Sequence, residues 1–554
     1  MTARPAGLAA SDAAPSSRSV PVLPVAVGTL FILAIVAWAN GFRTPFVFDD
    51  DVAVVHNASI RRLSWQALVP PARRIMAGRP VPNLTFALNF AVGGLDPTGY
   101  HVVNLLLHLA AALALLGIVR RTLPRAGLPA SLAGAEPWLA LVVAAVWLVH
   151  PLQTDAVTYV TQRTEVVMGL AYLLTLYAAI RAWDGPRPWT GLAIGACGLG
   201  MASKEVMISA PLMVVLYDRV FLAPSFGGAW RRRRVLYAGL AAACLVLAAL
   251  IVFTPRTETI GFDAAIGPWA YSTTQAGVLV QYLRLALWPD ALCIDHGVWV
   301  ARTAREIVPP GLLVLALLSG TALALARWRP VGFLGAWFFG ILAPTSSFVP
   351  IVSEVMAERR MYLPLAAVVA LVVVGGAAVG ARIAGRRLRV LAGVAAVVVV
   401  AALTAATIQR NRAYTSEASI LADTIRKRPG NYRARSNLAT ILIDDGRLDE
   451  AVAQLAEAIR LEPRFAQAHY NLGTAFLDQE RYEDAVAELE RTLRLEPSHV
   501  LAHVNLGTAL LNLGRVEEAR AQFARAVRLD PGQAQFRANL ERARQQAATE
   551  RNGR

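Results

Sequence analysis

The chain has 554 residues, of which 56% are hydrophobic and only 17% are charged. A soluble globular protein is about 45–50% apolar and about 25% charged, so this composition excludes a fully soluble chain and indicates a membrane protein. The net charge of +16 comes from residues 1–428, because the 17 arginines from Pro429 onward stand against 18 acidic residues. Basic loops are typical of the cytoplasmic side of a membrane region, so the charge does not call for a nucleic-acid partner.

Cysteine and lysine are both rare. Cys197, Cys244 and Cys293 lie in or beside apolar stretches without ligand-like spacing, which excludes a disulfide framework and a cysteine zinc site. Lys204 and Lys427 are the only lysines, against 52 arginines. This Ala/Arg-rich usage is typical of a bacterium with GC-rich DNA, so we expect an integral protein of the bacterial cytoplasmic membrane.

Eleven apolar runs are predicted to cross the membrane, since a helix needs about 20 such residues to span about 30 Å. The first run is interpreted as a retained span and not as a cleaved signal peptide. The predicted spans are 21–39, 102–119, 137–150, 165–183, 189–202, 205–222, 235–254, 308–326, 331–345, 361–380 and 389–408.

Arginine clusters that follow alternate spans predict the orientation. They are Arg120, Arg121 and Arg125; Arg181 and Arg187; Arg231 to Arg234; Arg327 and Arg329; and Arg382, Arg386, Arg387 and Arg389. All five clusters are cytoplasmic if the N-terminus is cytoplasmic and eleven spans follow. The run Gln275–Trp288 carries Gln281 and Arg284, so we expect an interfacial helix and not a twelfth span. The C-terminal region then faces the periplasm.

The C-terminal region repeats every 34 residues, as the prolines Pro429, Pro463, Pro497 and Pro531 show. This period is the signature of tetratricopeptide repeats, helix–turn–helix units that bury a core only by stacking. We therefore expect a linker and half-repeat at 409–428, three repeats at 429–531, and a capping helix with a tail at 532–554. The repeating residues are packing residues, and function is expected on the concave face. Candidates there are His469, Tyr470, His503 and Asn505.

The first external loop carries the most pointed chemistry. The predicted order is a tail and first span at 1–40, this loop at 41–100, and the remaining bundle at 101–408. The loop is too long for a plain connection, so we expect small helices in it. It opens with Asp49, Asp50 and Asp51 after an aromatic segment, and burial with mutual repulsion can raise a carboxyl pKa enough for it to accept a proton. A solvated acidic loop or helix cap is the alternative.

Further strings lie on the same predicted side. They are Arg79-Pro80, Leu84 to Asn89, Gly93 to Pro97, Tyr100 to His108, His150 to Val157, Arg163 to Glu165, Ser203 to Glu205 and Ala357 to Pro364. With the acidic pair and the repeats, these strings resemble the transmembrane-and-tetratricopeptide-repeat protein O-mannosyltransferases, a branch of the C-type (GT-C) glycosyltransferases. The resemblance covers nearly the whole chain.

The resemblance implies an all-α fold, namely a GT-C-type transmembrane bundle of about 11 spans with a C-terminal repeat solenoid. It also implies a polyprenyl-phosphate-linked sugar, with mannose expected, as donor and protein Ser/Thr hydroxyls as acceptors. The family's acidic pair falls on Asp49 and Asp50, and Asp51 is an extra acid. The other motif residues fall on His150, Pro151, Asp155, Ser203, Lys204, Glu205, Glu358, Arg359 and Tyr362.

Cations at the outer ends of spans point to the same side. Arg163, Lys204, Arg359 and Arg360 stand where short loops normally lack positive charge, and a leaving phosphate needs such groups. For Lys204 the alternative is headgroup contact or a local pair with Glu205. Arg79, His101 and His150 are also candidates for substrate binding, although an interfacial histidine is an equal reading for the last two. His108 is predicted to be a helix–helix hydrogen-bond partner.

No metal-ligand pattern or phosphate-binding glycine loop stands out, so we expect neither a divalent metal nor a bound nucleotide. The expected partners are the lipid-linked sugar donor, acceptor proteins or peptides, and other envelope proteins that bind the repeats. Two alternatives stay open. One is a membrane-anchored repeat scaffold without catalysis, and the other is an envelope polysaccharide ligase or polymerase. The intact acidic pair and motif strings favour the transferase.

Overall fold

The computed structural model describes residues 22–70, 75–185, 188–254, 266–347, 350–351, 354–383 and 386–552. In these ranges the chain forms a bundle of apolar helices followed by a C-terminal array of helices. The predicted all-α fold is confirmed. The N-terminal tail, Arg187, and the side chains of Arg386, Arg387 and Arg389 lie outside the described residues, as do the last two residues of the C-terminal tail.

Seven helices in the described part of the chain are long and apolar enough to cross a membrane. They are α1 (Val22–Trp38), α3 (Pro97–Thr122), α6 (Arg163–Asp184), α9 (Phe226–Phe253), α11 (Ala304–Arg327), α13 (Pro364–Ile383) and α14 (Arg386–Asn411). An eighth crossing results if α4 (Glu136–Val149) and the segment Pro151–Val157, which are bent by 51° at His150, count as one broken span. Each of these helices corresponds to a span that the sequence predicts.

Three further predicted spans are helical but short. They are α7 (Pro188–Met201), α8 (Ala210–Tyr217) with the π-helical turn Asp218–Leu222, and α12 (Arg329–Leu342). None of them reaches the length of about 20 residues that a straight crossing needs, so the number of eleven crossings stays a prediction. The ambiguous run Gln275–Trp288 falls almost wholly within α10 (Pro268–Leu287), which is not among the seven long apolar helices.

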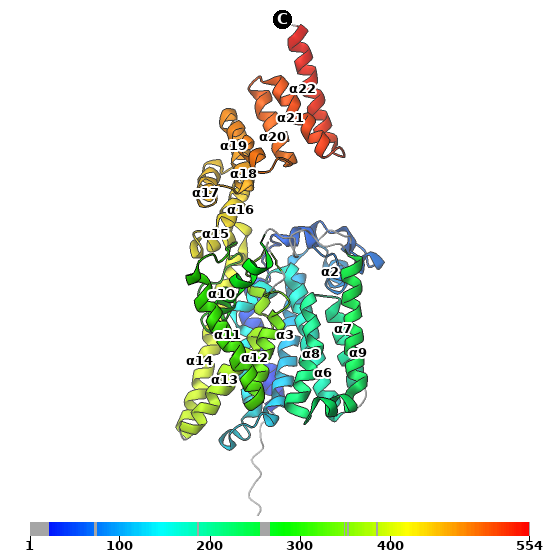
Figure 1. The fold of residues 1–554 in the computed structure, drawn as a ribbon, viewed down its shortest axis with the longest axis vertical. Helices are drawn as coiled ribbons and strands as arrows, with labels where there is room; N and C mark the ends of the chain where they lie inside the picture. Colours follow the sequence, from blue (N-terminus) through cyan, green and yellow to red (C-terminus); the bar gives the residue numbers. More distant parts are fainter. Residues whose placement is uncertain are drawn as a thin grey trace, which may run out of the picture.

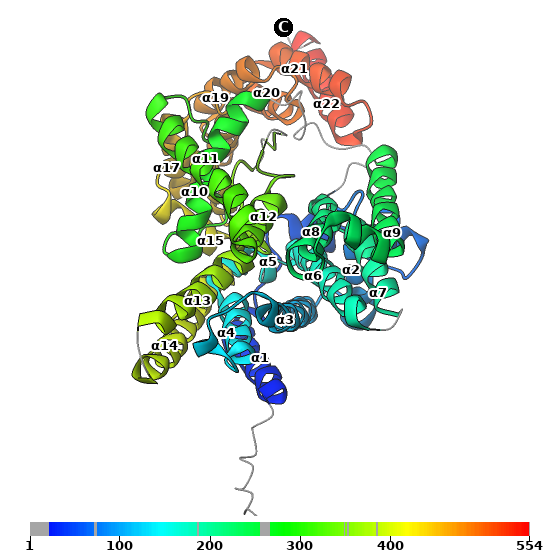
Figure 2. The ribbon, with the colours of Figure 1, turned by 60° about the horizontal axis from the view of Figure 1, so that its bottom comes forward.

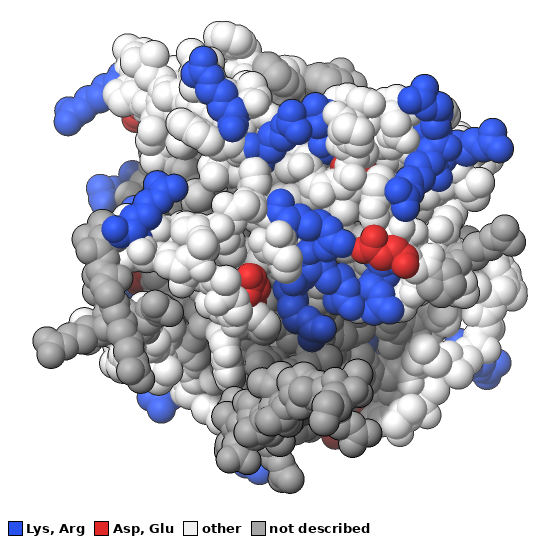
Figure 3. Space-filling view, turned by 90° about the horizontal axis from the view of Figure 1, so that it is seen from below, with Lys and Arg blue, Asp and Glu red and all other residues white. Residues whose placement is uncertain are grey.

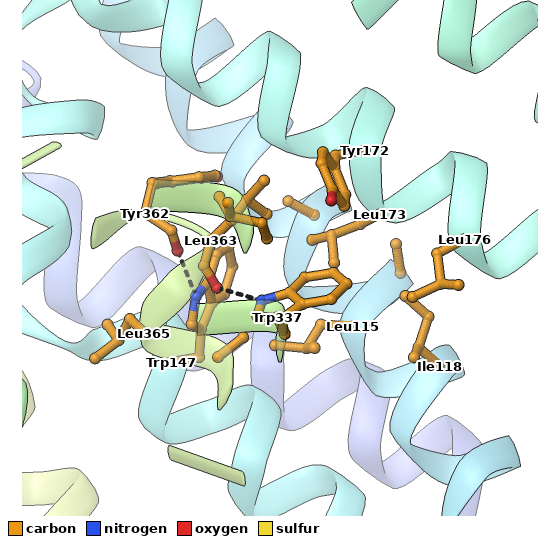
Figure 4. Close-up of a cluster of buried hydrophobic side chains, with 14 of the residues drawn as sticks. Leu115, Ile118, Trp147, Tyr172, Leu173, Leu176, Trp337, Tyr362, Leu363 and Leu365 are labelled. Carbon is orange, nitrogen blue, oxygen red and sulfur yellow. Dashed lines mark hydrogen bonds between the residues drawn. The ribbon is translucent and has the colours of Figure 1, made fainter. Parts of the chain in front are cut away.

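A layer of buried aromatic and aliphatic side chains forms part of the core of the bundle (Figure 4). The indole nitrogen of Trp147 donates to the carbonyl of Tyr362 at 2.9 Å, and that of Trp337 donates to the carbonyl of Leu363 at 2.9 Å. Both bonds satisfy buried polar atoms, so the two indole rings can be buried without the cost of an unpaired N–H group. Gly169 lets α6 approach this layer closely, since an added Cβ would lie 2.4 Å from Cε1 of Tyr362.

The C-terminal array contains the predicted repeats with their period intact. Its helices are α15 (Glu417–Lys427), α16 (Tyr432–Asp444), α17 (Leu448–Leu461), α18 (Ala466–Asp478), α19 (Tyr482–Leu495), α20 (Val500–Asn512), α21 (Val516–Leu529) and α22 (Ala534–Asn552). The helices α16, α18, α20 and α22 begin 34 residues apart. Buried Leu455, Leu489 and Phe523 hold the same position in successive repeats. At Gly473 an added Cβ would lie 2.7 Å from Cγ of Leu489, so only glycine allows this helix contact.

The array stands on the end of the bundle that also carries the first loop (Figure 1), and it curves above that end (Figure 2). Lys427 Nζ donates to the carbonyl of Leu292 at 2.7 Å, and Asn431 Nδ2 donates to the carbonyl of Asp295 at 2.9 Å. Arg410 Nη1 of α14 pairs with Asp423 of α15 at 2.7 Å. The base of the array is therefore joined to the bundle by polar contacts on two sides.

Candidate functional site

Asp50 is fully buried and ties the first loop to the segment before α6. The backbone nitrogen of Val47 donates to Asp50 Oδ2 at 3.1 Å, and the nitrogen and hydroxyl of Thr161 donate to Oδ1 at 2.6 and 2.5 Å. Burial raises the pKa of Asp50 to about 7, against the opposing effect of these hydrogen bonds. Because both oxygens are engaged and no surface is exposed, Asp50 holds the loop in place.

Asp49 has the opposite environment, since its side chain is exposed. Its backbone nitrogen donates to the hydroxyl of Tyr159 at 2.9 Å. Surrounding protein atoms and the charge of Glu354 raise the pKa of Asp49, while Arg359 and Arg79 act in the opposite direction. An accessible carboxylate with a raised pKa, set among cations, can take a proton from a bound hydroxyl.

The backbone just before Asp49 is strained. Phe48 has a φ of 50°, in the left-handed region that a bulky residue rarely adopts. Its nitrogen donates to the carboxylate of Glu417 at the start of α15, and its ring packs edge-on against Tyr159, with 6.1 Å between ring centroids. Such strain persists only where the surroundings hold it, and it occurs often at functional sites. The repeat array thus contributes one of the contacts that fix the acidic pair.

Arg359 joins two acidic groups at this end of the bundle. Its guanidinium pairs with Glu354 and lies 3.4 Å from Asp155 Oδ2, and its backbone nitrogen donates to the same oxygen at 3.0 Å. Burial opposes the ionisation of Glu354, but the charges of Arg359 and Arg360 outweigh it and lower its pKa to about 2. Sequence reasoning missed Glu354. The only available signal was an acid just upstream of the Glu-Arg-Arg string.

Arg360 and Lys204 are held by protein groups. Arg360 donates to the carbonyls of Thr345 and Val355 at 3.3 Å each and to that of Glu354 at 2.6 Å, so it fastens the loop before Glu358. The ammonium of Lys204 pairs with the carboxylate of Glu165, at the start of α6. Glu205 opens the 3₁₀ helix that follows Lys204 and also has an interaction partner.

Arg163 is fully buried, and neutral acceptors surround it. Its Nε donates to Asn104 Oδ1 at 2.6 Å, Nη1 donates to Asn89 Oδ1 at 2.7 Å, and Nη2 donates to the carbonyl of Tyr100 at 2.9 Å. Phe86 lies under the guanidinium at 4.6 Å. This geometry fixes α2 (Pro80–Gly93), α3 and α6 to one another, so the contacts of Arg163 are structural.

His101, His150 and His108, the three histidines singled out in the bundle, each make hydrogen bonds within the protein. His101 Nε2 lies 2.8 Å from the Thr44 hydroxyl and 2.9 Å from the Thr44 carbonyl. His150 Nδ1 accepts from the backbone nitrogen of Leu152 at 3.2 Å, and its Nε2 lies 3.2 Å from the carbonyl of Ala286. All three side chains are buried. The imidazoles of His101 and His150 are therefore not accessible to a substrate in this structure.

His108 and Tyr362 meet in the core. His108 Nδ1 lies 2.9 Å from the hydroxyl of Tyr362, and its Nε2 lies 3.0 Å from the carbonyl of Leu148. The predicted role of His108 as a helix–helix hydrogen-bond partner is confirmed. Tyr362 is fully buried and belongs to the same core layer (Figure 4).

Arg79 differs from the other cations. It lies just before α2, is half-buried, and its charge lowers the pKa of the Asp49 carboxyl. Its guanidinium has no hydrogen-bond or ion-pair partner among the residues that the structure describes. Of the cations named above, Arg79 is therefore the one beside Asp49 with donors available for an anion.

Glu358, which precedes Arg359 in the chain, forms a buried cluster with Cys293 and His296 that the sequence did not indicate. Glu358 Oε1 accepts from the backbone nitrogen of Cys293 at 2.7 Å and lies 2.9 Å from Nε2 of His296. The ligating atoms of these three residues lie within 4.8 Å of one another, close enough to share a metal ion. Burial opposes protonation of His296, but bonds with Cys293 and Glu358 outweigh it and raise its pKa to about 10, so the imidazole forms an ion pair with Glu358.

The two candidate histidines of the repeats belong to contacts within a single repeat, between its two helices. His469 bonds to Glu488 at 2.6 Å and to the carbonyl of Pro463 at 3.1 Å. His503 bonds to Gln522 at 2.7 Å and to the carbonyl of Pro497 at 3.2 Å. In the first repeat, Arg435 makes the same contacts with Gln454 and the carbonyl of Pro429. The position is thus a repeated structural clamp.

Tyr470 and Asn505 contact each other across adjacent repeats. Asn505 Nδ2 donates to the Tyr470 hydroxyl at 3.4 Å and to Thr474 Oγ1 at 3.0 Å, and Tyr470 stacks on His499 at 4.6 Å. Asn471 repeats the asparagine–threonine contact one unit earlier, with Thr440 at 3.0 Å. Both Tyr470 and Asn505 stay half-exposed and so remain accessible on the array surface.

Comparison with known proteins gives matches for both parts of the chain. Residues 417–468, 436–489 and 470–534 match the tetratricopeptide repeat family. The chain is 30% identical over 299 residues to "Protein O-mannosyl-transferase Tmtc2" of Drosophila melanogaster, over 48% of this chain and 30% of that protein. It is 24% identical over 486 residues to "Protein O-mannosyl-transferase TMTC4" of Homo sapiens, over 76% of this chain and 64% of that protein.

Among solved structures, the first TPR domain of the human RPAP3 protein matches at 20% identity, over 22% of this chain and 97% of that chain, with a TM-score of 0.22. The chain spans less than two thirds of the length of the curated relatives named above. The repeat family and the relatives together confirm the resemblance that the motif strings indicate.

Proposed function

Because the chain is a relative of the transmembrane-and-tetratricopeptide-repeat protein O-mannosyl-transferases, we propose that it is a membrane glycosyltransferase. Its reaction moves a sugar, mannose first, from a polyprenyl phosphate to a Ser or Thr hydroxyl of a protein. The observation that carries the proposal is the exposed Asp49 carboxylate beside the open guanidinium of Arg79. The names of the relatives supply the reaction class.

Asp49 is the proposed general base, and Asp50 is its positioning residue. The acceptor oxygen attacks the anomeric carbon and forms the new glycosidic bond, while the bond from that carbon to the phosphate oxygen breaks. The hydroxyl proton passes to the Asp49 carboxylate, and the electron pair of the broken bond leaves with the phosphate. A single displacement inverts the anomeric carbon.

Arg79 is the proposed binder of the leaving phosphate. Its guanidinium N–H groups have no acceptor among the described residues. Arg163, in contrast, donates to protein acceptors, and Lys204 pairs with Glu165. The charge of Arg359 also acts on Asp49, but its guanidinium already bridges Glu354 and Asp155. A cation fixed where negative charge develops lowers the barrier without having to reorganise during the reaction.

The array is the proposed binding surface for acceptor proteins. Tetratricopeptide repeats form extended concave surfaces, and this array shares an end of the bundle with Asp49 (Figure 1). The contact between Glu417 and the Phe48 nitrogen joins the first helix of the array to the acidic pair. This proximity supports recruitment of an acceptor next to the base. Under the predicted topology, this end faces the periplasm.

The test is transfer of labelled mannose from polyprenyl-phosphate mannose to a Ser/Thr peptide by the purified full-length protein. Asp49→Asn should lower kcat by about 10²- to 10⁴-fold, the range for loss of a general base. Arg79→Ala should raise the apparent KM for the donor and leave that for the peptide unchanged, because only the donor carries phosphate.

The matched control is Asp51→Asn, which changes the adjacent exposed acid that pairs with His56. This variant should retain kcat within about twofold. Near-normal turnover by Asp49→Asn would remove the base assignment. Absence of transfer from every polyprenyl-phosphate hexose tried with wild-type protein would overturn the proposed reaction itself.

A further inference from the structure

A cavity of about 770 Å³ lies at the end of the bundle opposite Asp49. It is lined by the last turns of α3, by one side of nearly the whole of α13, and by the turn between α11 and α12. Tyr217 at the end of α8, and Val220 and Phe221 just after it, complete this part of the lining. The lining on α13 extends from Ala366 to Arg382, about 24 Å of helix at 1.5 Å per residue. This length exceeds about 15 Å, half of the hydrocarbon thickness of a bilayer.

The inner end of this cavity is closed by the core layer. Leu115, Ile118, Leu176 and Trp337 belong both to the cavity lining and to the packed cluster of Figure 4. Trp337 is held there by its bond to the carbonyl of Leu363. Of the residues that the structure describes, no acidic one lines the cavity, so it is an apolar site distinct from the acidic groups around Asp49.

Four arginines line the other part of the cavity: Arg125, Arg327, Arg329 and Arg382. Arg125 is partly neutralised by Asp184 at 2.8 Å. The other three are exposed and have no ion-pair or hydrogen-bond partner within the described ranges. Figure 3 shows Lys and Arg side chains gathered on this end of the molecule. Positive charges that line one cavity repel one another, and an anion bound among them would reduce this repulsion.

An apolar cavity that ends in unpaired guanidinium groups matches one chemical class, a lipid with an anionic phosphate headgroup. We propose that this cavity binds an anionic phospholipid of the adjacent leaflet, with an acyl chain against the core layer and the phosphate among Arg327, Arg329 and Arg382. Guanidinium groups bind phosphate through paired hydrogen bonds. Under the predicted topology the leaflet is the cytoplasmic one, and the inference does not depend on the transferase activity.

Native mass spectrometry of the full-length protein, exchanged with phosphatidylglycerol or phosphatidylcholine of identical acyl chains, tests the proposal. The wild type should retain phosphatidylglycerol in preference. Arg327→Ala with Arg329→Ala should weaken its retention about 25-fold, since one basic residue near a membrane surface contributes about fivefold. The matched control is Arg231→Ala with Arg234→Ala, which removes two exposed arginines of α9 that do not line the cavity.

A second variant tests the apolar part. Gly375 lines the cavity, and a Cβ added there meets no atom within 4 Å, so Gly375→Trp should direct a bulky side chain into the space that the acyl chain would occupy. It should lower retention of phosphatidylglycerol while the unfolding temperature of the lipid-free protein stays unchanged. Equal retention of both lipids by wild type, or equal losses in the α9 control and the cavity variant, would overturn the proposal. Competition by inorganic phosphate alone would also overturn it, because the acyl chain would then contribute nothing.

Discussion

At the scale of single residues, two adjacent aspartates have been given different tasks by their surroundings. Asp50 accepts three hydrogen bonds and has no exposed surface, whereas Asp49 is open to solvent. The same side chain can therefore act as an anchor at one position and as a base at the next. Phe48 separates the pair from the preceding segment with a left-handed backbone that Glu417 and Tyr159 hold in place.

The anchor role of Asp50 makes stability depend on pH in a defined direction. Its pKa rises from 3.8 to about 7 on folding, so the folded protein holds this proton more tightly than the unfolded chain does. The corresponding stabilisation is complete below about pH 4 and is lost as the pH rises through 7. Between pH 4 and 8, wild type should lose more unfolding temperature than Asp50→Asn, which cannot titrate there.

Asp50→Asn should also be less stable at pH 4, because its amide presents donors to buried N–H groups, and one unmet donor costs about 1–3 kcal/mol. Differential scanning fluorimetry in detergent measures both effects. Asp49→Asn is the control, since the same substitution at an exposed position breaks none of these bonds. Parallel pH profiles for wild type and Asp50→Asn would contradict the anchor role.

At the scale of elements, close helix contacts at glycines and buried polar clamps determine how the parts fit. α6 approaches the turn at Tyr362 only because Gly169 has no side chain. In the array, one position per repeat, occupied by Arg435, His469 and His503, joins the carbonyl of a preceding proline to a polar side chain of the following helix. The residue type varies, but the hydrogen-bonding task is the same.

Gly169→Ala should therefore destabilise the bundle. The new Cβ would lie 2.4 Å from the ring of Tyr362, and moving that ring breaks its bond to His108. Overpacking of this kind costs about 1–3 kcal/mol. Thermal unfolding of the detergent-solubilised protein measures the change.

Gly198→Ala in α7 is the matched control, because a Cβ there meets no atom within 4 Å. This substitution should be neutral or slightly stabilising, since alanine favours a helix by about 1 kcal/mol over glycine. Equal unfolding temperatures for the two alanine variants would show that the contact between α6 and Tyr362 is not tight.

At the scale of the whole molecule, the array and the acidic pair lie at one end of the bundle, and the arginine-lined cavity lies at the other. α14 returns the chain from the second end to the first, where Asn411 Oδ1 accepts from Thr158 Oγ1 at 2.8 Å. The array and Asp49 therefore lie at the same end of the bundle, which predicts a shared compartment whatever the number of crossings. The arginine bias then predicts which compartment this is.

A reporter enzyme that is active only in the periplasm tests this orientation. Fused after Arg554, it should be active, because α14 delivers the array to the Asp49 side. Fused within 382–389, it should be silent, since these residues lie at the arginine-rich end. The two fusions control each other, because they differ only by the crossing of α14. Cytoplasmic placement of the Arg554 fusion would put the proposed acceptor surface on the wrong side of the membrane.

The sequence by itself determined the features that depend on local pattern. The 34-residue period predicted the array, apolar runs predicted helices at the positions where they occur, and the acidic string located the loop that holds Asp49 and Asp50. Periodicity and composition act between near neighbours in the chain, so a single sequence displays them directly.

Only the tertiary structure decided what each polar side chain is free to do. Lys204 meets Glu165 across 39 positions, Arg359 meets Asp155 across 204, and Phe48 meets Glu417 across 369. No local pattern encodes such pairs, because they arise when helices pack. Packing also placed buried acceptors around the guanidinium of Arg163, whereas that of Arg79 has no acceptor among the described residues. It is the reason that one aspartate became an anchor while its neighbour stayed available to a substrate.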